Sequence, residues 1–239
     1  MNRALSLCAV VALVTMATAC AAAAPQAAPS PSPTEHVAAV DPSRPLEDQL
    51  HEAVRAGDAA LVSALVDAGV DIDAPVSGNT TVLHLAVIRD DIALVEAVLR
   101  GSPDVHALND SNDPVLMLAC EHGKNPAVIT ALLDAGADPS VPASDNVGSM
   151  PLHICAAQDH VDGIMVLLER GVDVNQRQAT YEGTPLLVAA WAGHLSAAEL
   201  LLTMGADPTL TDVEGGTPLA WAKAYGHGDV AALIEQFGG

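Results

Sequence analysis

The chain has 239 residues, and 50% of them are hydrophobic while only 2% are aromatic, so its core has to be built from small and aliphatic side chains. Thirty acidic residues oppose nine basic ones, which gives a formal net charge of −21 at pH 7. Such a charge repels phosphate backbones and anionic lipid headgroups. Nucleic-acid binding is therefore not expected, and a protein partner with a basic or neutral face is favoured.

Residues 1–19 have the parts of a secretory signal, namely Arg3 in a short basic region, an apolar run, and small residues at its exit. The run is too short for a comfortable membrane span. The exit motif "ATAC" resembles the lipobox of bacterial lipoproteins, except that Ala17 stands where leucine is most frequent. This resemblance implies that Cys20 is lipidated and becomes the new N-terminus. Ordinary signal peptidase accepts the same small residues, so soluble secretion remains the alternative.

The next segment, residues 20–45, is rich in alanine, proline and serine and contains the sequence "PSPSP". This composition cannot bury a core, so it predicts a disordered tether between a membrane anchor and a folded domain. Any contact with a membrane is expected only through the lipidated N-terminus. The predicted location is outside the cytoplasm, on a membrane or in the periplasm or at the cell surface.

The rest of the chain, residues 46–239, repeats a pattern with a period near 33 residues. It is clearest in "TVLHLAVIRDD", "MPLHICAAQDH" and "TPLLVAAWAGH", and a second motif such as "LLDAGADPS" keeps step with it. The intervals between successive reference leucines are 33, 33, 36, 34 and 33 residues, the leucines being Leu50, Leu83, Leu116, Leu152, Leu186 and Leu219.

Together the two motifs resemble the ankyrin repeat, with its T-P-L-H opening and its closing L-L-x-x-G-A-D. The resemblance implies an all-α solenoid of about six helix-turn-helix units with short β-hairpin-like fingers. The units are predicted near residues 46–78, 79–111, 112–147, 148–182, 183–215 and 216–239. Because a single unit cannot bury both faces, the solenoid depends on stacking, and the two terminal units are expected to be atypical.

Within each unit, Thr and Pro at the head of the first helix provide a cap and a preset first turn. A glycine after the second helix suits a left-handed cap, and the candidates are Gly69, Gly101, Gly136, Gly171 and Gly205. The interval of 36 residues indicates an insertion in the finger that follows Ala137.

The histidines follow the repeat, which favours a structural role over metal binding or catalysis. His51, His84 and His153 occupy the T-P-L-H position, and His160, His194 and His227 occupy the G-H position. One histidine per repeat leaves too few ligands at one point for zinc. The acidic turn "NDSNDP" lacks the glycine and distant glutamate of an EF-hand loop, and no P-loop or G-x-S-x-G motif occurs. No cofactor is expected, and an enzyme or metal protein is the least favoured alternative.

Cys120 and Cys155 both replace an alanine of a first helix, and an oxidising compartment would permit a disulfide between them. They stand at different positions relative to their reference leucines. Neighbouring helices lie roughly 8–10 Å apart, farther than the Cα separation of a disulfide. The sequence therefore predicts two buried free thiols.

The surface is left to carry the function, which is predicted to be non-catalytic protein binding in the concave groove. The resemblance implies that partners bind the fingers and the exposed positions of the first helices. The exposed columns contain Trp191, Ile88 and Glu121 in one and Tyr225 and Arg89 in the next, and Trp221 falls in a packing column. Tyr181 and Arg177 on a finger extend this candidate surface, and Asp110, Asp113, Asp145, Asp212 and Glu214 are expected to form its acidic rim. A soluble secreted effector or inhibitor using the same groove is the alternative function.

Overall fold

The computed structural model describes residues 39–144 and 147–238, and in these residues it contains twelve α-helices and no strand. The predicted all-α solenoid of helix-turn-helix units is confirmed. The helices are α1 (Leu46–Ala56), α2 (Ala59–Asp67), α3 (Val82–Ile88), α4 (Ile92–Leu99), α5 (Val115–His122), α6 (Pro126–Asp134), α7 (Pro151–Ala157), α8 (Val161–Glu169), α9 (Pro185–Ala192), α10 (Leu195–Thr203), α11 (Pro218–Ala224) and α12 (Gly228–Gln236).

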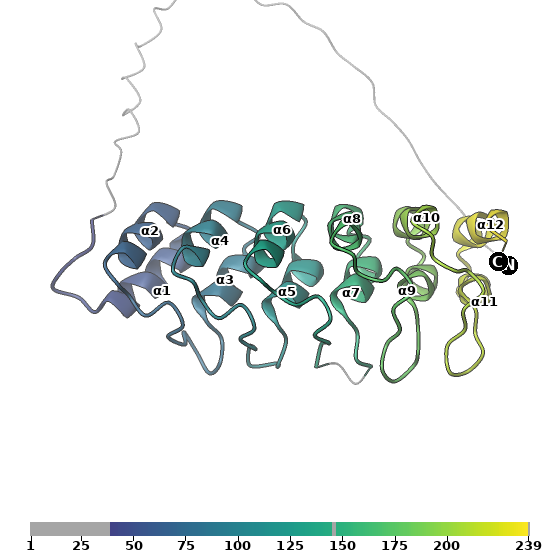
Figure 1. The fold of residues 1–239 in the computed structure, drawn as a ribbon, viewed down its shortest axis with the longest axis horizontal. Helices are drawn as coiled ribbons and strands as arrows, with labels where there is room; N and C mark the ends of the chain where they lie inside the picture. The colour runs from purple at the N-terminus through teal and green to yellow at the C-terminus, as the bar shows by residue number, and fades with distance from the viewer. Residues whose placement is uncertain (1–38, 145–146, 239) are drawn as a thin grey trace, which may run out of the picture. The chain divides into compact units, whose positions relative to one another are not determined.

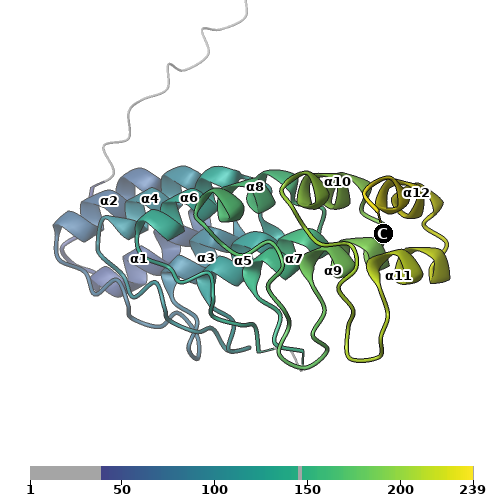
Figure 2. The same cartoon turned by 45° about the vertical axis from the view of Figure 1, so that its right-hand side comes forward.

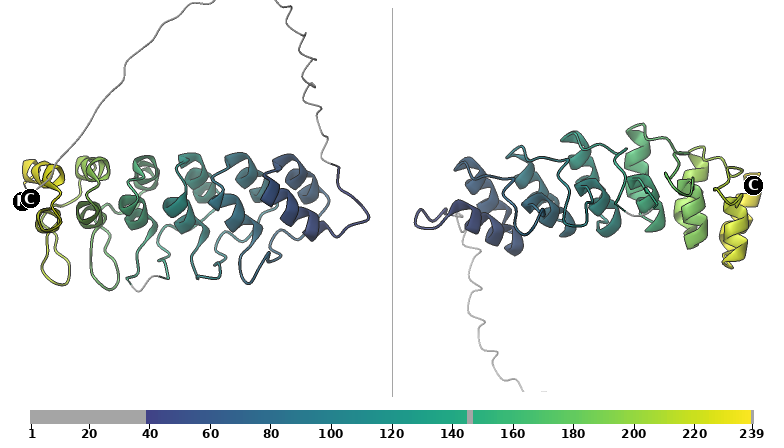
Figure 3. Two further views of the ribbon diagram at one scale, coloured as in Figure 1. Left: turned by 180° about the vertical axis from the view of Figure 1, so that it is seen from behind. Right: turned by 90° about the horizontal axis from the view of Figure 1, so that it is seen from below.

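The helices form two layers, with the odd-numbered helices in one and the even-numbered helices in the other (Figures 1 and 2). Each odd helix packs against the next odd helix and against its own even partner. The loops from each even helix to the next odd helix project past the odd layer, as Figure 3 also shows from behind. We call these loops fingers 1 to 5; they comprise residues 68–81, 100–114, 135–150, 170–184 and 204–217. No helix within the described residues is both long enough and apolar enough to cross a membrane.

The core lies between the layers and between successive units. The reference leucines of the first five units are at most 1% exposed, whereas Leu219 of the last unit is half-buried because no further unit covers it. At the other end, the side chain of Gln49 is 4% exposed and closes the turn before α1. Its amide nitrogen donates to the carbonyl of Asp41 (2.8 Å), and its oxygen accepts from the Asp41 N–H (2.8 Å). Both ends are therefore atypical, as the repeat predicts.

The helix ends follow the expected chemistry with one correction. The hydroxyl of Thr184 accepts from the Leu187 N–H at 3.2 Å, and that of Thr217 accepts from the Ala220 N–H at 3.1 Å. The glycines after α2, α6, α8 and α10 have positive φ, but Gly101 does not. Ser102, which stands 33 residues after Gly69, takes the left-handed conformation instead, with φ of 53°. The prediction for Gly101 was wrong because it followed the residue type and not the repeat register.

The repeat histidines connect neighbouring units. The Nε2–H of His153 donates to the Gly183 carbonyl at 3.1 Å, that of His194 to Ala157 at 2.8 Å, and that of His227 to Trp191 at 3.1 Å. At the head of α3, the Nδ1 of His84 accepts from the Thr81 N–H at 3.1 Å. Burial lowers the pKa of His84 because the cationic form would lose its hydration. These contacts hold one unit against the next.

Cys120 and Cys155 form a disulfide between α5 and α7, with a Cα–Cα distance of 4.7 Å. The prediction of two free thiols was wrong because it compared the distance between helix axes with a limit that applies to Cα atoms. Axes about 8–10 Å apart leave facing Cα atoms only about 3–5 Å apart, since each Cα lies about 2.3 Å from its axis. Both sulfurs are buried, so the bond joins the third and fourth units from inside the core.

We predict that reduction of this disulfide destabilises the solenoid. The bond closes a loop with a sequence separation of 35 residues, for which the expected loss is about 2–4 kcal/mol of unfolding free energy. Urea titrations of the full chain with and without a phosphine reductant measure the difference. The Cys120→Ala/Cys155→Ala double variant is the control and should unfold at one midpoint under both conditions. Equal midpoints for the wild-type chain would contradict the prediction.

Candidate functional site

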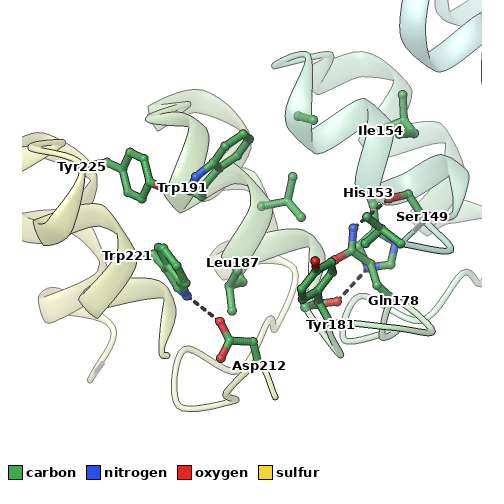
Figure 4. A pocket seen from close by; sticks show the side chains of 14 residues that line it. Ser149, His153, Ile154, Gln178, Tyr181, Leu187, Trp191, Asp212, Trp221 and Tyr225 are labelled. Carbon is green, nitrogen blue, oxygen red and sulfur yellow. Dashed lines mark hydrogen bonds between the residues drawn. The ribbon is translucent and has the colours of Figure 1, made fainter. Parts of the chain in front are cut away.

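A groove of 540 Å³ opens on the odd-helix layer between the fourth and sixth units. We call it the aromatic groove. Its walls come from α7, α9 and α11 and from fingers 3, 4 and 5 (Figure 4). The lining residues are Val147, Ser149, His153, Ile154, Ala157, Gln178, Tyr181, Gly183, Leu187, Val188, Trp191, Asp212, Trp221 and Tyr225.

Three aromatic rings form one wall of the groove. Tyr225 lies between the two tryptophans, 5.9 Å from Trp191 in an edge-on arrangement and 5.7 Å from Trp221, measured between ring centroids. Trp191 is 48% exposed and Tyr225 is 54% exposed. Rings at such distances stabilise one another, so the wall is held in place although about half of its surface faces solvent.

Asp212 holds the third ring of this wall in place. Its Oδ2 accepts from the indole N–H of Trp221 at 2.6 Å, and its Oδ1 accepts from the backbone N–H groups of Glu214 and Gly216 at 2.9 and 2.8 Å. Partial burial acts to raise the pKa of Asp212, but these donors outweigh it and hold the pKa below its ordinary value. The carboxylate is therefore charged at neutral pH and fixes the orientation of the indole.

The opposite side of the groove is built from fingers 3 and 4. The amide of Gln178 donates to the Ser149 hydroxyl at 2.8 Å, which ties the two fingers together. The carbonyl of Tyr181 accepts from the Val213 N–H of finger 5 at 3.0 Å, while the ring of Tyr181 is 50% exposed. Tyr181 thus presents an aromatic side chain on a finger that is bonded to its neighbours on both sides.

Four of the predicted partner-binding residues line this one groove: Trp191, Tyr225, Tyr181 and Asp212. Trp221 lines it as well, although the sequence analysis assigned that residue to a packing column. The assignment was incomplete because the same column supplies Ile154 and Val188, which are half-buried and form part of the groove floor. The signal in the sequence was the change from aliphatic residues to a tryptophan, which has a polar N–H that needs a partner.

The other predicted residues lie outside the groove. Arg177 is next to it and donates to the carbonyls of Glu182 and Thr211 at 3.1 and 3.0 Å. Ile88 and Arg89 belong to the second unit, where the Arg89 guanidinium donates to the Arg55 carbonyl at 2.9 Å. Asp145 lies outside the described residues.

Two further predicted residues, Glu121 and Asp110, have other surroundings. Glu121 borders a hollow of 310 Å³ on finger 2 and finger 3, which shares Ile154 with the aromatic groove. Asp110 accepts from the Asn79 N–H of the preceding finger at 2.6 Å. The acidic finger residues therefore also serve as acceptors for backbone groups between repeats.

The described residues include no group of three or more His, Cys, Asp or Glu side chains placed to hold a metal ion. Both ring nitrogens of His153 in the groove have partners, since Nδ1 accepts from the Met150 N–H at 3.2 Å and Nε2–H donates to Gly183. The groove therefore offers aromatic faces, an aliphatic floor and one carboxylate to a ligand. This set suits recognition of a side chain.

A family model described as ankyrin repeats (3 copies) matches residues 50–143, 83–178 and 116–212. Protein PhlB of Serratia liquefaciens is 38% identical over 96 residues, which cover 40% of this chain and 41% of PhlB. Human ARF GTPase-activating protein GIT1 is 38% identical over 88 residues, covering 37% of this chain and 12% of GIT1. The chain thus spans less than half the length of either relative. The crystal structure of the human ASB11 ankyrin repeat domain has the same fold, with a TM-score of 0.71 at 24% identity, covering 80% of this chain and 83% of that one.

We predict that Asp212→Asn loosens Trp221. In a Trp191→Phe background, Trp221 is the only tryptophan, so its fluorescence reports on this contact directly. The variant should shift the emission to longer wavelength, increase quenching by acrylamide, and cost about 1–3 kcal/mol of unfolding free energy, because several donors lose a charged acceptor. Glu214→Gln, an exposed carboxylate on the same finger, is the matched control. Identical spectra for the two variants would rule out a positioning role for Asp212.

Proposed function

Because the chain belongs to the ankyrin-repeat family, we propose that it is an exported, non-catalytic protein that holds a protein partner in the aromatic groove. One observation carries this proposal. The chain has two tryptophans, two tyrosines and one phenylalanine, and both tryptophans and both tyrosines line this groove. Aromatic side chains that are partly exposed in a hollow are the usual anchors of protein interfaces.

The rigidity of the groove supports the same function. Its aromatic wall is bonded to finger 5 through Asp212, and fingers 3, 4 and 5 are joined by the contacts of Gln178 and Tyr181. A surface that is already ordered loses little conformational entropy when a partner binds. A partner would therefore meet preformed contacts, which favours recognition by rigid surfaces.

The proposed location is outside the cytoplasm, with a lipid anchor at Cys20 and the tether of residues 20–45 between the membrane and the solenoid. These residues lie outside the described part of the chain, and the lipobox resemblance is the basis of the anchor. The disulfide between Cys120 and Cys155 supports export, since disulfides persist in oxidising compartments and are rare in the cytosol. A soluble secreted effector or inhibitor that uses the same groove is the second candidate, and it differs only at the N-terminus.

We predict that Trp191→Ala reduces capture of the native partner from an envelope extract at least about tenfold, since truncation of an interface anchor costs about 2 kcal/mol or more. Ile88→Ala is the matched control: Ile88 is 45% exposed in the same column, and it lies outside the groove. Because the Trp191 ring also contacts Tyr225, the variant should lower the melting temperature by about 2–4 °C. If both variants capture the same proteins in equal amounts, the groove is not the binding site.

We also predict that the mature chain begins at Cys20 and carries acyl chains. Mass spectrometry of the N-terminal peptide from the membrane fraction measures both properties. Cys20→Ala should move the protein out of that fraction, whereas Cys8→Ala, a change within the leader, should leave it there. A mature N-terminus after residue 20 without added acyl mass would favour the soluble secreted form.

A further inference from the structure

The surroundings of the aromatic groove are poor in free cations. Residues 147–238 contain eleven acidic residues and three basic ones. Each of the three basic side chains is paired with a carboxylate: Arg170 with Asp134 at 2.8 Å, Arg177 with Glu182 at 3.0 Å, and Lys223 with Glu235 at 2.7 Å. The field around the groove is therefore negative, and the described basic side chains near it already have partners.

The groove itself adds to this negative character. Its lining residues include the carboxylate of Asp212 and no lysine or arginine. The rings of Trp191, Tyr225 and Tyr181 are each about half exposed, and the face of an aromatic ring carries negative partial charge. An acidic partner would meet repulsion from both sources, while a cation would be attracted by both.

We propose that the groove binds an extended basic segment of the partner, with an arginine or lysine side chain lying on the Trp191 and Tyr225 wall beside Asp212. The inference rests on the proposed function and adds the chemistry of the partner. A cation over an aromatic face gains most over tryptophan, and arginine is the more frequent donor. Its planar guanidinium stacks on a ring and is more weakly hydrated than an ammonium group, so it is less costly to desolvate.

The remainder of the groove suits the flanking residues of such a segment. Leu187 is 8% exposed, and Ile154 and Val188 are half-buried, so the floor between the Trp191 wall and Tyr181 is apolar. Small apolar residues next to the cation would cover this floor, and Tyr181 closes the far side (Figure 4). The best occupant therefore combines one cation with apolar neighbours.

The test uses labelled nine-residue peptides of sequence SPALXLAPS, in which X is arginine, lysine, citrulline or glutamate, and the full chain. Citrulline has nearly the shape of arginine without its charge, so this pair isolates the cation. We expect the arginine peptide to bind about tenfold more tightly than the citrulline peptide by fluorescence anisotropy. The preference should shrink as salt is raised, and the glutamate peptide should bind least.

Variants locate the binding site. Trp191→Leu and Tyr225→Leu should each weaken the arginine peptide about tenfold and bring it close to the citrulline peptide. Asp212→Asn should reduce the salt dependence, and Ile88→Ala should change nothing. Equal binding of the arginine and citrulline peptides would overturn the proposal, as would a preference for glutamate or the failure of all four peptides to bind.

The proposed function fails by a different result. If Trp191→Ala abolishes capture of the native partner while the peptides show no preference for a cation, the groove is a binding site for another chemistry. If capture does not depend on Trp191, the proposed binding site itself is wrong. The two experiments therefore separate the existence of the interface from the nature of its occupant.

Discussion

Stacking of each helix pair on its neighbours is the constraint on which this structure depends, because a pair of short helices has apolar residues on both faces and no means of covering them alone. Leu186 is fully buried between units, while Leu219 in the last unit remains half-buried. Buried histidines add polar bonds between units at fixed positions, as His194 does with Ala157. The fingers and odd helices are positioned by the same stacking, so the geometry of the groove follows from the core.

The features that repeat were predictable from the sequence, because each occurs several times with the same physical cause. The leucine interval predicted the units, and the Thr-Pro motif predicted caps that are present at Thr184 and Thr217. The repeat register was more reliable than residue type, as Ser102 shows. That serine takes the left-handed cap conformation because of its place in the period, although glycine is the residue that adopts it most easily.

The features that occur once were harder to predict, because they depend on distances between particular side chains. The Cys120–Cys155 disulfide requires that two Cα atoms on facing sides of α5 and α7 approach within 4.7 Å, and a helix spacing does not determine this. Likewise, the packing column that contains Trp221 turned out to border the groove. A column position gives the direction of a side chain, but its exposure depends on what the adjacent finger covers, and Asp212 belongs to such a finger.

The acidic residues of the fingers combine two roles that are often separate. Asp110 and Asp212 accept hydrogen bonds from backbone N–H groups, which fixes the fingers, and a carboxylate that accepts such bonds keeps its charge. A fixed charge needs no reorganisation when a partner approaches, whereas a flexible surface carboxylate loses rotamer freedom on forming an ion pair. The bonds that order the fingers therefore also hold a negative field around the aromatic rings. Stability of the solenoid and selectivity of the groove for a cationic side chain thus arise from the same carboxylates.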